Sequence, residues 1–310
     1  MKHLITGAAG FIGSHLVDKL LAAGDEVIAL DNFLTGRSKN IKHHFDDKKF
    51  QFLQQDVIDE IDCKPDAIWH LACPASPIHY QADPLRTIET CYKGTLNVLQ
   101  LAKKTNAKLL IASTSEVYGD PLIHPQSEQY LGNVNPVGPR ACYDEGKRIA
   151  ETLAFNFWAE YQVQVKIARI FNTYGPRMSP DDGRVISNFI VQALSGQRLT
   201  IYGDGKTTRS FCFVKDTVEG LMQIMQSNGD LVFNVGNPNE IDLLCLASLI
   251  AEKTFTTASF VHLDKPQDDP QRRMPEISKL TQATGWSPTT ALSDGLDQTI
   301  SYFKNELQIS

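Results

Sequence analysis

Short apolar runs alternate with amphipathic segments along the first half of the chain. The runs typical of buried strands cover residues 2–6, 26–31, 50–56, 66–72, 107–113 and 163–170. Apolar residues at helical spacing predict helices between them, the clearest of which cover 14–24, 84–105 and 143–161. Strands that alternate with helices indicate a parallel sheet covered on both faces. We therefore predict an α/β fold with a doubly wound, Rossmann-like parallel sheet.

The pattern changes after about residue 171. Long polar loops rich in Gly and Pro, such as 171–184 and 202–209, separate shorter apolar runs there. We interpret 1–170 as a sheet domain, to which elements after 170 also contribute. Residues 171–310 are predicted to form mainly a smaller substrate-binding lobe, whose loops close over one end of the sheet.

A glycine-rich turn joins the first predicted strand to the first helix. Gly7, Gly10 and Gly13 allow a tight turn, close approach of the backbone to a pyrophosphate, and tight packing of the helix. Asp31 ends the next strand, where a carboxylate accepts the ribose hydroxyls of a dinucleotide. It would also repel a 2′-phosphate, which favours NAD over NADP, although the nearby Arg37 weakens that preference. The first 170 residues are therefore interpreted as an NAD-binding domain.

Tyr143 and Lys147 lie one helical turn apart, so their side chains share a face. The pKa of a phenol is ordinarily near 10, which makes it a weak base at neutral pH. A neighbouring ammonium and an oxidised nicotinamide ring would both stabilise the phenolate and lower that pKa. We therefore interpret the pair as an acid–base couple, with Lys147 also placed to hold the nicotinamide ribose.

The segment directly after the fifth predicted strand carries three polar side chains. Thr114 and Ser115 offer hydroxyl groups, and Glu116 offers a carboxylate. Ligands of open α/β sheets bind at the carboxyl ends of the strands, where this segment lies. We expect an apolar pocket to raise the pKa of Glu116 enough for proton transfer.

The chain resembles the extended short-chain dehydrogenase/reductase family, whose members act on nucleotide sugars. The resemblance rests on "TGAAGFIGSHL", "YDEGK", "RIFNTYGPR" and "YGDGKTTRSF", and it covers nearly the whole chain. Longer strings, "STSEVYGDPLIHPQSE", "GPRMSPDDGRV" and "DDPQRRMP", are similar to the UDP-glucuronate decarboxylases within that family. Two departures are Cys73, which replaces the first Ser of the "ASPASP" that is frequent in that subfamily, and Cys91, which stands where the subfamily usually has an Asn. Both lie near the expected cofactor pocket.

The resemblance implies NAD-dependent decarboxylation of UDP-glucuronate to UDP-xylose. Oxidation at carbon 4 of the sugar gives a β-keto acid, which loses carbon dioxide readily, and the ketone is then reduced so that NAD+ is regenerated. Tyr143 is the expected base at the 4-hydroxyl of the sugar, and Thr114 is expected to hold the oxygen of that hydroxyl. Ser115 and Glu116 are expected to face carbons 5 and 6, with Glu116 delivering a proton to carbon 5. Related dehydratases typically carry an Asp where this chain has Ser115.

The expected binding residues follow from the same alignment of motifs. The cofactor site is predicted to comprise Gly7, Gly10, Phe11, Ile12, Gly13, Asp31, Asn32, Phe33, Thr35, Gly36, Asp56, Val57, Leu71, Thr90, Ser113, Tyr143 and Lys147. The substrate site is predicted to comprise Asn172, Arg184, Tyr202, Arg209 and Arg273. Arginine suits these positions because its guanidinium binds phosphate and carboxylate groups bidentately. Arg273 is expected beside the substrate carboxylate.

Composition narrows the remaining possibilities. Thirty basic and 36 acidic residues give a net charge of −6, which disfavours a nucleic-acid surface. Six singly placed cysteines without metal-ligand spacing predict buried free thiols in a reducing compartment and no metal site. No leader pattern and no apolar run of membrane length is seen, so we expect a cytoplasmic protein. The resemblance implies a homodimer through the helices near 84–105 and 143–161.

Two other functions remain open from the sequence. One is a different nucleotide-sugar enzyme, a 4-epimerase or 4,6-dehydratase, which would share the cofactor and the Tyr143–Lys147 couple. The other is a non-catalytic sensor that only binds a dinucleotide. Assays with alternative nucleotide sugars separate the first from a decarboxylase, and loss of turnover in a Tyr143→Phe variant excludes the second.

Overall fold

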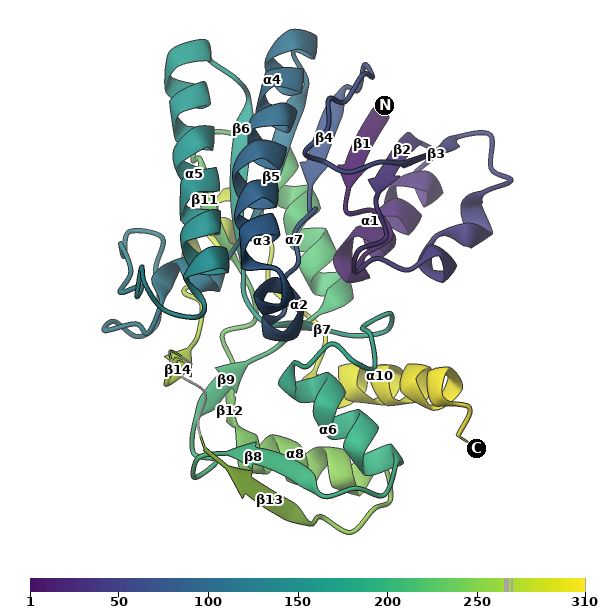
Figure 1. The fold of residues 1–310 in the computed structure, drawn as a ribbon, viewed down its shortest axis with the longest axis vertical. Coiled ribbons are helices and arrows are strands. Elements are labelled where there is room, and N and C mark those ends of the chain that lie inside the picture. Colours follow the sequence, from purple (N-terminus) through teal and green to yellow (C-terminus); the bar gives the residue numbers. More distant parts are fainter. Residues whose placement is uncertain (265–267, 269, 310) are drawn as a thin grey trace.

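A seven-stranded parallel sheet forms the centre of the protein (Figure 1). The computed structural model describes residues 1–264, 268 and 270–309. The sheet strands are β1 (Lys2–Thr6), β2 (Glu26–Asp31), β3 (Phe50–Gln54), β4 (Ala67–His70), β5 (Lys108–Thr114), β6 (Val165–Ile170) and β11 (Val232–Val235). Their order is β11-β6-β5-β4-β1-β2-β3, and all neighbouring pairs are parallel. The predicted fold class is confirmed, and β11 shows that a segment after residue 170 joins the sheet.

Side chains of alternate strand residues enter two separate cores, because successive strand residues point to opposite faces. Leu4 and Ile28 pack with the core under α4 (Thr95–Thr105) and α5 (Ala141–Tyr161). Ile5 and Val27 belong to the core shared with α1 (Phe11–Ala22) and α7 (Val214–Gln226). Both faces of the sheet are therefore covered, which explains why the strands read as nearly continuous apolar runs.

The predicted helix at 84–105 is interrupted by a turn of π-helix. It consists of α3 (Pro84–Glu89), the π turn η3 (Thr90–Gly94) and α4. Asp83 caps α3 by accepting a hydrogen bond from the Arg86 backbone N–H at 3.0 Å. Such π turns widen a helix locally and are frequent at functional sites. Here the turn carries Thr90 onto the wall of the cavity described below.

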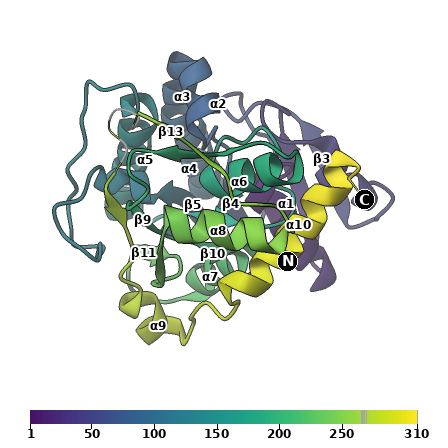
Figure 2. The same cartoon turned by 90° about the horizontal axis from the view of Figure 1, so that it is seen from below.

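The smaller lobe lies beneath the carboxyl ends of the strands (Figure 1). Its elements and the connecting ones are α2 (Pro77–Ala82), α6 (Val185–Leu194), α8 (Leu243–Lys253), α9 (Ser278–Thr284), α10 (Leu292–Leu307), β7 (Thr173–Tyr174), β8 (Leu199–Tyr202), β9 (Thr208–Ser210), β10 (Cys212–Phe213), β12 (Glu240–Asp242), β13 (Phe260–Leu263), β14 (Arg272–Arg273), η1 (Ser38–Asn40), η2 (Lys42–His44) and η4 (Ser115–Tyr118). Figure 2 shows α6, α8 and α10 gathered in this lobe. Its core is continuous with the α1/α7 side of the sheet, since Phe189 and Phe303 belong to the same cluster as Ile5.

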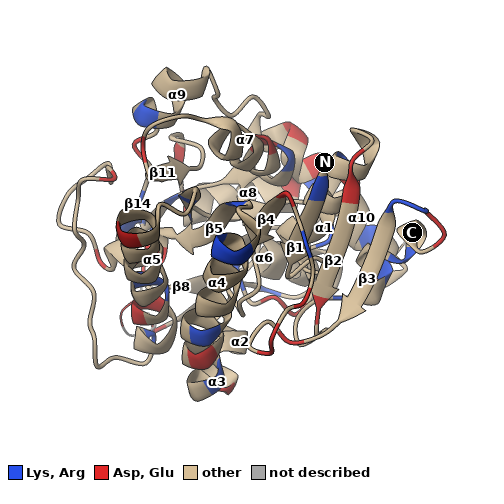
Figure 3. Cartoon of the chain, turned by 90° about the horizontal axis from the view of Figure 1, so that it is seen from above, with Lys and Arg blue, Asp and Glu red and all other residues tan. Residues whose placement is uncertain are grey.

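Charged residues are mixed along the helices. Figure 3 shows acidic and basic positions interspersed over α3, α4 and α5, without a continuous basic strip on them. This agrees with the net charge of −6. Within the part of the chain that the structure describes, no helix is both long enough and apolar enough to cross a membrane.

Candidate active site

The carboxyl ends of the strands open onto a cavity of about 590 Å³, whose walls come from the sheet and from the smaller lobe. Small-molecule sites typically enclose about 300–1,000 Å³. Every predicted catalytic and substrate-binding residue lies on its wall, as do most of the predicted cofactor residues. Phe33 and Gly36 do not line it. The Phe33 ring packs against Phe52, with 5.1 Å between ring centroids, and Gly36 lies against the Asp31 carboxylate.

The glycine turn brings the start of α1 to the cavity. Gly7 has a φ of +72°, and a Cβ there would lie 2.8 Å from the Ala72 backbone nitrogen. A Cβ on Gly13 would lie 2.1 Å from the Gly7 carbonyl oxygen. No side chain caps α1, and Phe11, Ile12 and Gly13 of its first turn line the cavity. The free N–H groups of a helix start favour bound phosphate, so the chain fits a dinucleotide here.

Asp31 is held rigidly at the end of β2. Its two carboxylate oxygens accept backbone N–H groups from Ala9 at 2.9 Å and Phe33 at 2.8 Å. Burial raises the pKa of this carboxyl, and the two hydrogen bonds oppose that effect. Arg37 does not neutralise Asp31, because its guanidinium donates to Glu306 at 3.0 Å and to the Tyr302 hydroxyl at 2.7 Å.

Asp56 also lies on the cavity wall, where it is already engaged by other side chains. Its Oδ2 accepts hydrogen bonds from Asn32 at 2.5 Å and from Arg86 at 2.6 Å. Burial would raise the pKa of Asp56, but these donors and the Ile58 backbone N–H outweigh it and lower the pKa.

The predicted Tyr143–Lys147 couple lies in the first two turns of α5. The Tyr143 phenol hydrogen-bonds with the Thr114 side chain, and its ring stacks on Tyr80 with 4.9 Å between centroids. The Lys147 ammonium donates to the Ala112 carbonyl at 2.9 Å and lies 5.9 Å from the centre of the Tyr143 ring. All three side chains expected at carbon 4 are therefore neighbours.

The lowering of the Tyr143 pKa by a bound nicotinamide ring stays a prediction, and the protein's own groups shift this pKa in the opposite direction. Burial raises the pKa of this phenol well above its ordinary value, and the nearby Cys73 thiol adds to that effect. The Thr114 hydrogen bond lowers the pKa by less than burial raises it. The phenol of Tyr143 is therefore protonated at neutral pH.

Glu116 lies among arginines rather than in an apolar pocket. Arg273 binds both of its oxygens, at 2.6 and 2.7 Å, and Arg140 lies 2.9 Å from the Oε2 atom. Burial alone would raise the pKa, but the two guanidinium charges outweigh it and lower the pKa of Glu116 to about 2. The predicted upward shift is therefore wrong, because the sequence shows neither arginine beside the carboxylate. Glu116 is ionised at neutral pH.

The predicted substrate residues are divided between free and engaged side chains. Tyr202 is 40% exposed, and the Asn172 amide is 3.5 Å from the Ser210 carbonyl. Arg184 is paired with Asp182, with one contact of 2.6 Å. Arg209 is buried and donates to the carbonyl oxygens of residues 208, 270 and 271 at 2.9, 2.7 and 3.2 Å. It thereby connects β9 to the residues just before β14, which carries Arg273.

Several groups at the site were missed by sequence reasoning. Arg140 precedes α5, and a cation at a helix start opposes the helix dipole, which is the one signal the sequence offered. Asp144 is buried, and burial followed by the Glu116 charge raises its pKa to about 8. Cys73 and Cys91 have their sulfur atoms 3.4 Å apart, although they are 18 positions apart in the chain. The prediction of buried thiols is confirmed for three of the six cysteines, since Cys63 and Cys73 are half-buried and Cys245 is exposed.

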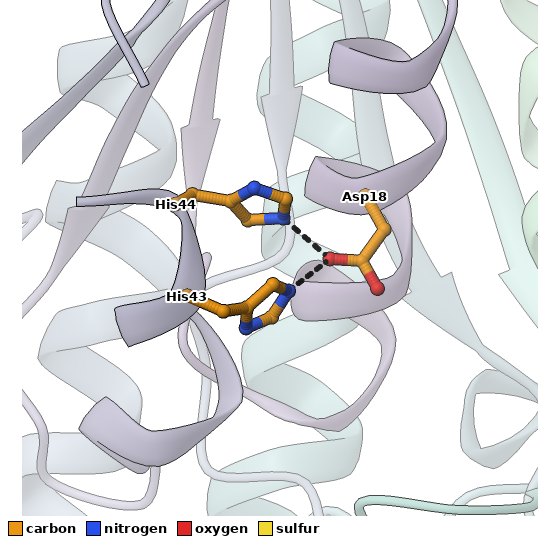
Figure 4. A group of neighbouring side chains, drawn as sticks. All are labelled: Asp18, His43 and His44. Carbon is orange, nitrogen blue, oxygen red and sulfur yellow. Dashed lines mark hydrogen bonds and ion pairs between the residues drawn. The ribbon is translucent and has the colours of Figure 1, made fainter. Parts of the chain in front are cut away.

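One His/Asp group outside the cavity has side chains close enough to share an ion (Figure 4). The Nε2 atoms of His43 and His44 lie 3.1 and 2.7 Å from the same Asp18 oxygen, Oδ1. Arg177 donates to the other oxygen at 2.6 Å, and its charge opposes a second cation. We assign this group to the attachment of η2 to α1. The absence of a metal from the function stays a prediction.

The sequence matches the GDP-mannose 4,6 dehydratase family over residues 4–299. UDP-glucuronic acid decarboxylase 4 of Arabidopsis thaliana is 52% identical over 307 residues, which are 99% of this chain and 69% of that protein. UDP-glucuronic acid decarboxylase 1 of Xenopus tropicalis is 52% identical over 305 residues, which are 98% of this chain and 72% of that protein.

Solved structures of related enzymes share the fold at lower identity. UDP-glucose 4-epimerase of Thermotoga maritima, with UDP-glucose, gives a TM-score of 0.91 at 30% identity and covers 99% of this chain and 100% of its own. UDP-glucuronic acid 4-epimerase of Bacillus cereus, with UDP-glucuronic acid and NAD, gives 0.88 at 29%, with coverage of 99% and 100%. By sequence and by fold, the chain belongs to the UDP-glucuronic acid decarboxylases of the extended short-chain dehydrogenase/reductase family.

Proposed function

We propose that this protein is an NAD-dependent decarboxylase that converts UDP-glucuronate to UDP-xylose through a 4-keto intermediate. The observation that carries the proposal is one cavity that holds both Tyr143 and the Glu116–Arg273 pair in a chain of this family. Tyr143 serves oxidation and reduction at carbon 4. The Glu116–Arg273 pair supplies charged groups where the substrate carboxylate is lost.

NAD+, when bound, would supply the hydride acceptor for carbon 4 and the hydride for the final reduction. The uncapped start of α1 is proposed to bind its diphosphate, and Asp31 to bind the adenosine ribose. The oriented Asp31 carboxylate and the engagement of Arg37 by Glu306 both support NAD over NADP. Lys147, whose ammonium donates to the carbonyl of Ala112, is proposed to hold the second ribose.

Tyr143 is proposed to remove the proton of the 4-hydroxyl, whose oxygen Thr114 also holds. Because burial raises the Tyr143 pKa, the phenolate forms only when positive charge compensates it. The Lys147 ammonium and the oxidised nicotinamide ring provide that charge. Tyr143 is then a base only when the oxidised cofactor is bound, which couples deprotonation to hydride removal.

The arginines around Glu116 are proposed to bind the anionic groups of the reaction. Arg273 and Arg140 carry positive charge at the place where carbons 5 and 6 are expected, so they can hold the substrate carboxylate. The enolate oxygen would form on carbon 4, where Tyr143 and Thr114 are proposed to hold it. An ionised Glu116 cannot itself act as an acid at neutral pH. It can orient a water molecule, and that water is proposed to deliver the proton to carbon 5.

The lobe side of the cavity is proposed to bind the uridine diphosphate. Arg184 lies at the start of α6 and Tyr202 at the end of β8, on the cavity wall. Asn172 joins them from the segment between β6 and β7. The partial exposure of Tyr202 and Arg184 supports this role, because both can reorient toward a ligand. Arg209 is proposed to act by positioning β14 rather than by direct contact.

The product assay decides between this function and the nearest alternative. Purified protein incubated with UDP-glucuronate and NAD+ is expected to release carbon dioxide and UDP-xylose, followed by NMR, without net formation of NADH. A 4-epimerase would give the carbon-4 epimer of UDP-glucuronate and no carbon dioxide. The likeness to the Bacillus cereus 4-epimerase makes that the alternative to exclude. Absence of carbon dioxide release would refute the proposal.

A Tyr143→Phe variant tests the catalytic role and excludes a sensor. We expect it to retain NAD binding and to lose turnover by several orders of magnitude. Tyr161→Phe is the matched control, since Tyr161 lies at the far end of the same helix and is exposed. Turnover close to wild type in Tyr143→Phe would contradict the assignment of the base.

The helices α3 and α5 are proposed to form a homodimer interface. Leu85, Ile88 and Tyr92 follow one another at helical spacing and are 79%, 43% and 47% exposed. Ile149 on the neighbouring α5 is also exposed, so apolar side chains are presented by both helices. Light scattering of a Leu85→Glu/Ile88→Glu variant should show the mass of a single chain where the wild type shows twice that mass. Phe255→Glu, at a 93% exposed site in the other lobe, should not change the mass. A wild type with the mass of one chain would contradict the dimer.

The cytoplasmic location stays a prediction.

A further inference from the structure

Two thiols that the proposed chemistry does not use meet at the cavity wall. Cys73 follows β4 and lines the cavity, and Cys91 lies in the π turn η3. Their sulfur atoms are 3.4 Å apart, at hydrogen-bond distance, and no bond joins them. Cys91 is only 2% exposed, whereas Cys73 is half-buried. One thiol is therefore reachable from the cavity and the other is sheltered behind it.

The two thiols differ in their ionisation. The hydrogen bond from Cys91, with help from the Lys147 charge and against the effect of burial, lowers the pKa of Cys73 to about 7. The same hydrogen bond, together with burial, raises the pKa of Cys91 well above its ordinary value. At neutral pH one thiol is thus partly a thiolate while its neighbour stays protonated. Oxidation-sensitive cysteines have this arrangement of a reactive thiolate beside a second thiol that resolves the product.

The pair packs directly on the helix that carries Tyr143 and Lys147. A Cβ on Gly146 would lie 3.0 Å from the Cys91 sulfur and 3.1 Å from the Cys91 Cβ. Cys73 packs in the small cluster that includes Tyr80 and Tyr143. The third thiol of this region, Cys142, instead donates to the Tyr80 carbonyl at 3.6 Å. Movement of Cys91 therefore reaches α5 between the two residues proposed to act at carbon 4.

We propose that Cys73 and Cys91 form a peroxide-sensitive dithiol, a reversible oxidation site in the wall of the cofactor cavity. The Cys73 thiolate attacks one oxygen of hydrogen peroxide. The O–O bond breaks, hydroxide leaves, and the sulfur becomes a sulfenic acid. The Cys91 sulfur then attacks the Cys73 sulfur and forms the disulfide bond. The S–O bond of the sulfenic acid breaks, and its hydroxyl leaves as water after taking up the Cys91 proton. The peroxide has accepted two electrons, and a dithiol reductant restores both thiols.

Disulfide formation has a structural consequence that links the pair to activity. The sulfur atoms must approach from 3.4 Å to about 2 Å, the length of a disulfide bond. This contraction pulls the π turn and Cys73 together beneath Tyr143 and beside Thr90. We expect turnover to fall several-fold in the oxidised protein and to recover on reduction. The expected change in turnover rests on the proposed decarboxylation, whereas the thiol chemistry does not.

The test begins with peptide mapping of the full chain. Reduced protein is treated with one equivalent of hydrogen peroxide, the remaining thiols are alkylated, and peptides are analysed by mass spectrometry. A Cys73–Cys91 cross-linked peptide that disappears after dithiothreitol is expected. In Cys91→Ser, dimedone should trap a sulfenic acid on Cys73, and in Cys73→Ser neither product should form. Cys245→Ser, which removes the exposed thiol, should give the same cross-link as the wild type.

The turnover measurement runs in parallel on the same samples. Each rate is compared with that of the same protein before peroxide, and the loss and recovery should follow the cross-linked fraction in wild type and Cys245→Ser. Alkylation of both Cys73 and Cys91 after peroxide, with no cross-link, would overturn the proposal. A cross-link without any change in turnover would overturn its link to activity. Failure of the untreated protein to decarboxylate UDP-glucuronate would overturn the proposed function instead, and the mapping would still decide the thiol proposal.

Discussion

The charge of Glu116 depends on residues that are far from it in the chain. Its neighbour Arg140 is 24 positions away, and Arg273 is 157 positions away. Two guanidinium groups keep the carboxylate ionised despite burial, so its pKa falls rather than rises. The same cluster has the opposite effect on Asp144, where burial and the Glu116 charge raise the pKa to about 8. A single polar network thus sets two carboxyl groups in different protonation states.

The ion pair of Glu116 is expected to contribute to stability as well as to activity. Replacement by Gln removes the partner of the buried Arg273, which typically costs about 3–5 kcal/mol. Chemical denaturation of Glu116→Gln should show a loss of that order, and turnover should fall at least tenfold. Glu252→Gln, at an exposed position, serves as the control and should match the wild type.

The pH dependence of that contribution has a definite sign. The folded-state pKa of Glu116 is lowered from 4.5 to about 2, so ionisation favours the folded protein above the unfolded value. The stabilisation is therefore complete above pH 4.5 and is lost as the pH falls toward about 2. The stability of the wild type should decline more steeply across that window than that of Glu116→Gln. Parallel declines would contradict the assigned ion pair.

Asp144 should show the reverse dependence. Its folded-state pKa is raised from 3.8 to about 8, so the protonated form favours the folded protein. Stability from this group is complete below pH 3.8 and is lost as the pH rises through about 8. Asp144→Asn keeps the neutral shape and removes the titration. Thermal unfolding should show the variant gaining stability relative to the wild type as the pH is raised across that window.

At the scale of elements, two helices meet the cavity through local departures from regular packing. The start of α1 approaches β1 closely enough that only glycine fits at position 13. The π turn η3 interrupts what would otherwise be one long helix and places Thr90 and Cys91 at the cavity and its rear wall.

Gly13→Ala is expected to weaken NAD binding at least tenfold. The added Cβ would lie 2.1 Å from the Gly7 carbonyl oxygen, a backbone atom, so α1 must move away from the turn. The helix start then no longer faces the cofactor phosphates. Isothermal titration with NAD+ measures the loss. Ala23→Gly, at the exposed C-terminal cap of the same helix, is the control and should bind NAD+ as the wild type does.

At the scale of the whole molecule, the last helix returns to the cofactor end of the sheet. Glu306 of α10 is paired with Lys39 and with Arg37, the latter at 3.0 Å. Arg37 also donates to the Tyr302 hydroxyl at 2.7 Å and to the Met178 carbonyl at 3.3 Å. The loop after β2 is thereby attached to the smaller lobe. This attachment also occupies the one arginine beside Asp31 that sequence reasoning had weighed in favour of NADP.

Release of Arg37 should reduce the preference for NAD. In a Glu306→Gln/Tyr302→Phe variant the guanidinium loses two partners and can turn toward a 2′-phosphate, while Asp31 still repels that group. The ratio of the NADP and NAD dissociation constants should therefore fall several-fold without inverting. An unchanged ratio would show that Asp31 alone sets the preference. Lys253→Gln, which removes a separate ion pair with Asp297 on α10, should leave the ratio unchanged.

The sequence alone was enough to predict the fold class, the first six strands of the sheet, the glycine turn and most of the residues that line the cavity. These features leave local signals: apolar periodicity for strands, Gly7 and Gly13 for the turn, and Tyr143 four residues before Lys147. The helix at 84–105 was predicted with both of its ends, but its π turn was not, since a single π turn preserves the helical pattern on both sides. Phe33 and Gly36 were expected at the cofactor site but do not line the cavity, because only three-dimensional packing decides which loop atoms face inward.

Only the tertiary structure decided the electrostatics of the site. The ionised Glu116, the raised pKa of Asp144, the engaged Arg37 and the contact of Cys73 with Cys91 each join residues from separate elements. A pKa depends on burial and on charges a few ångströms away, and neither is a property of neighbouring positions in the chain. Local pattern therefore predicted most of the residues that reach the cavity, whereas folding decided the rest and the charge that each residue carries there.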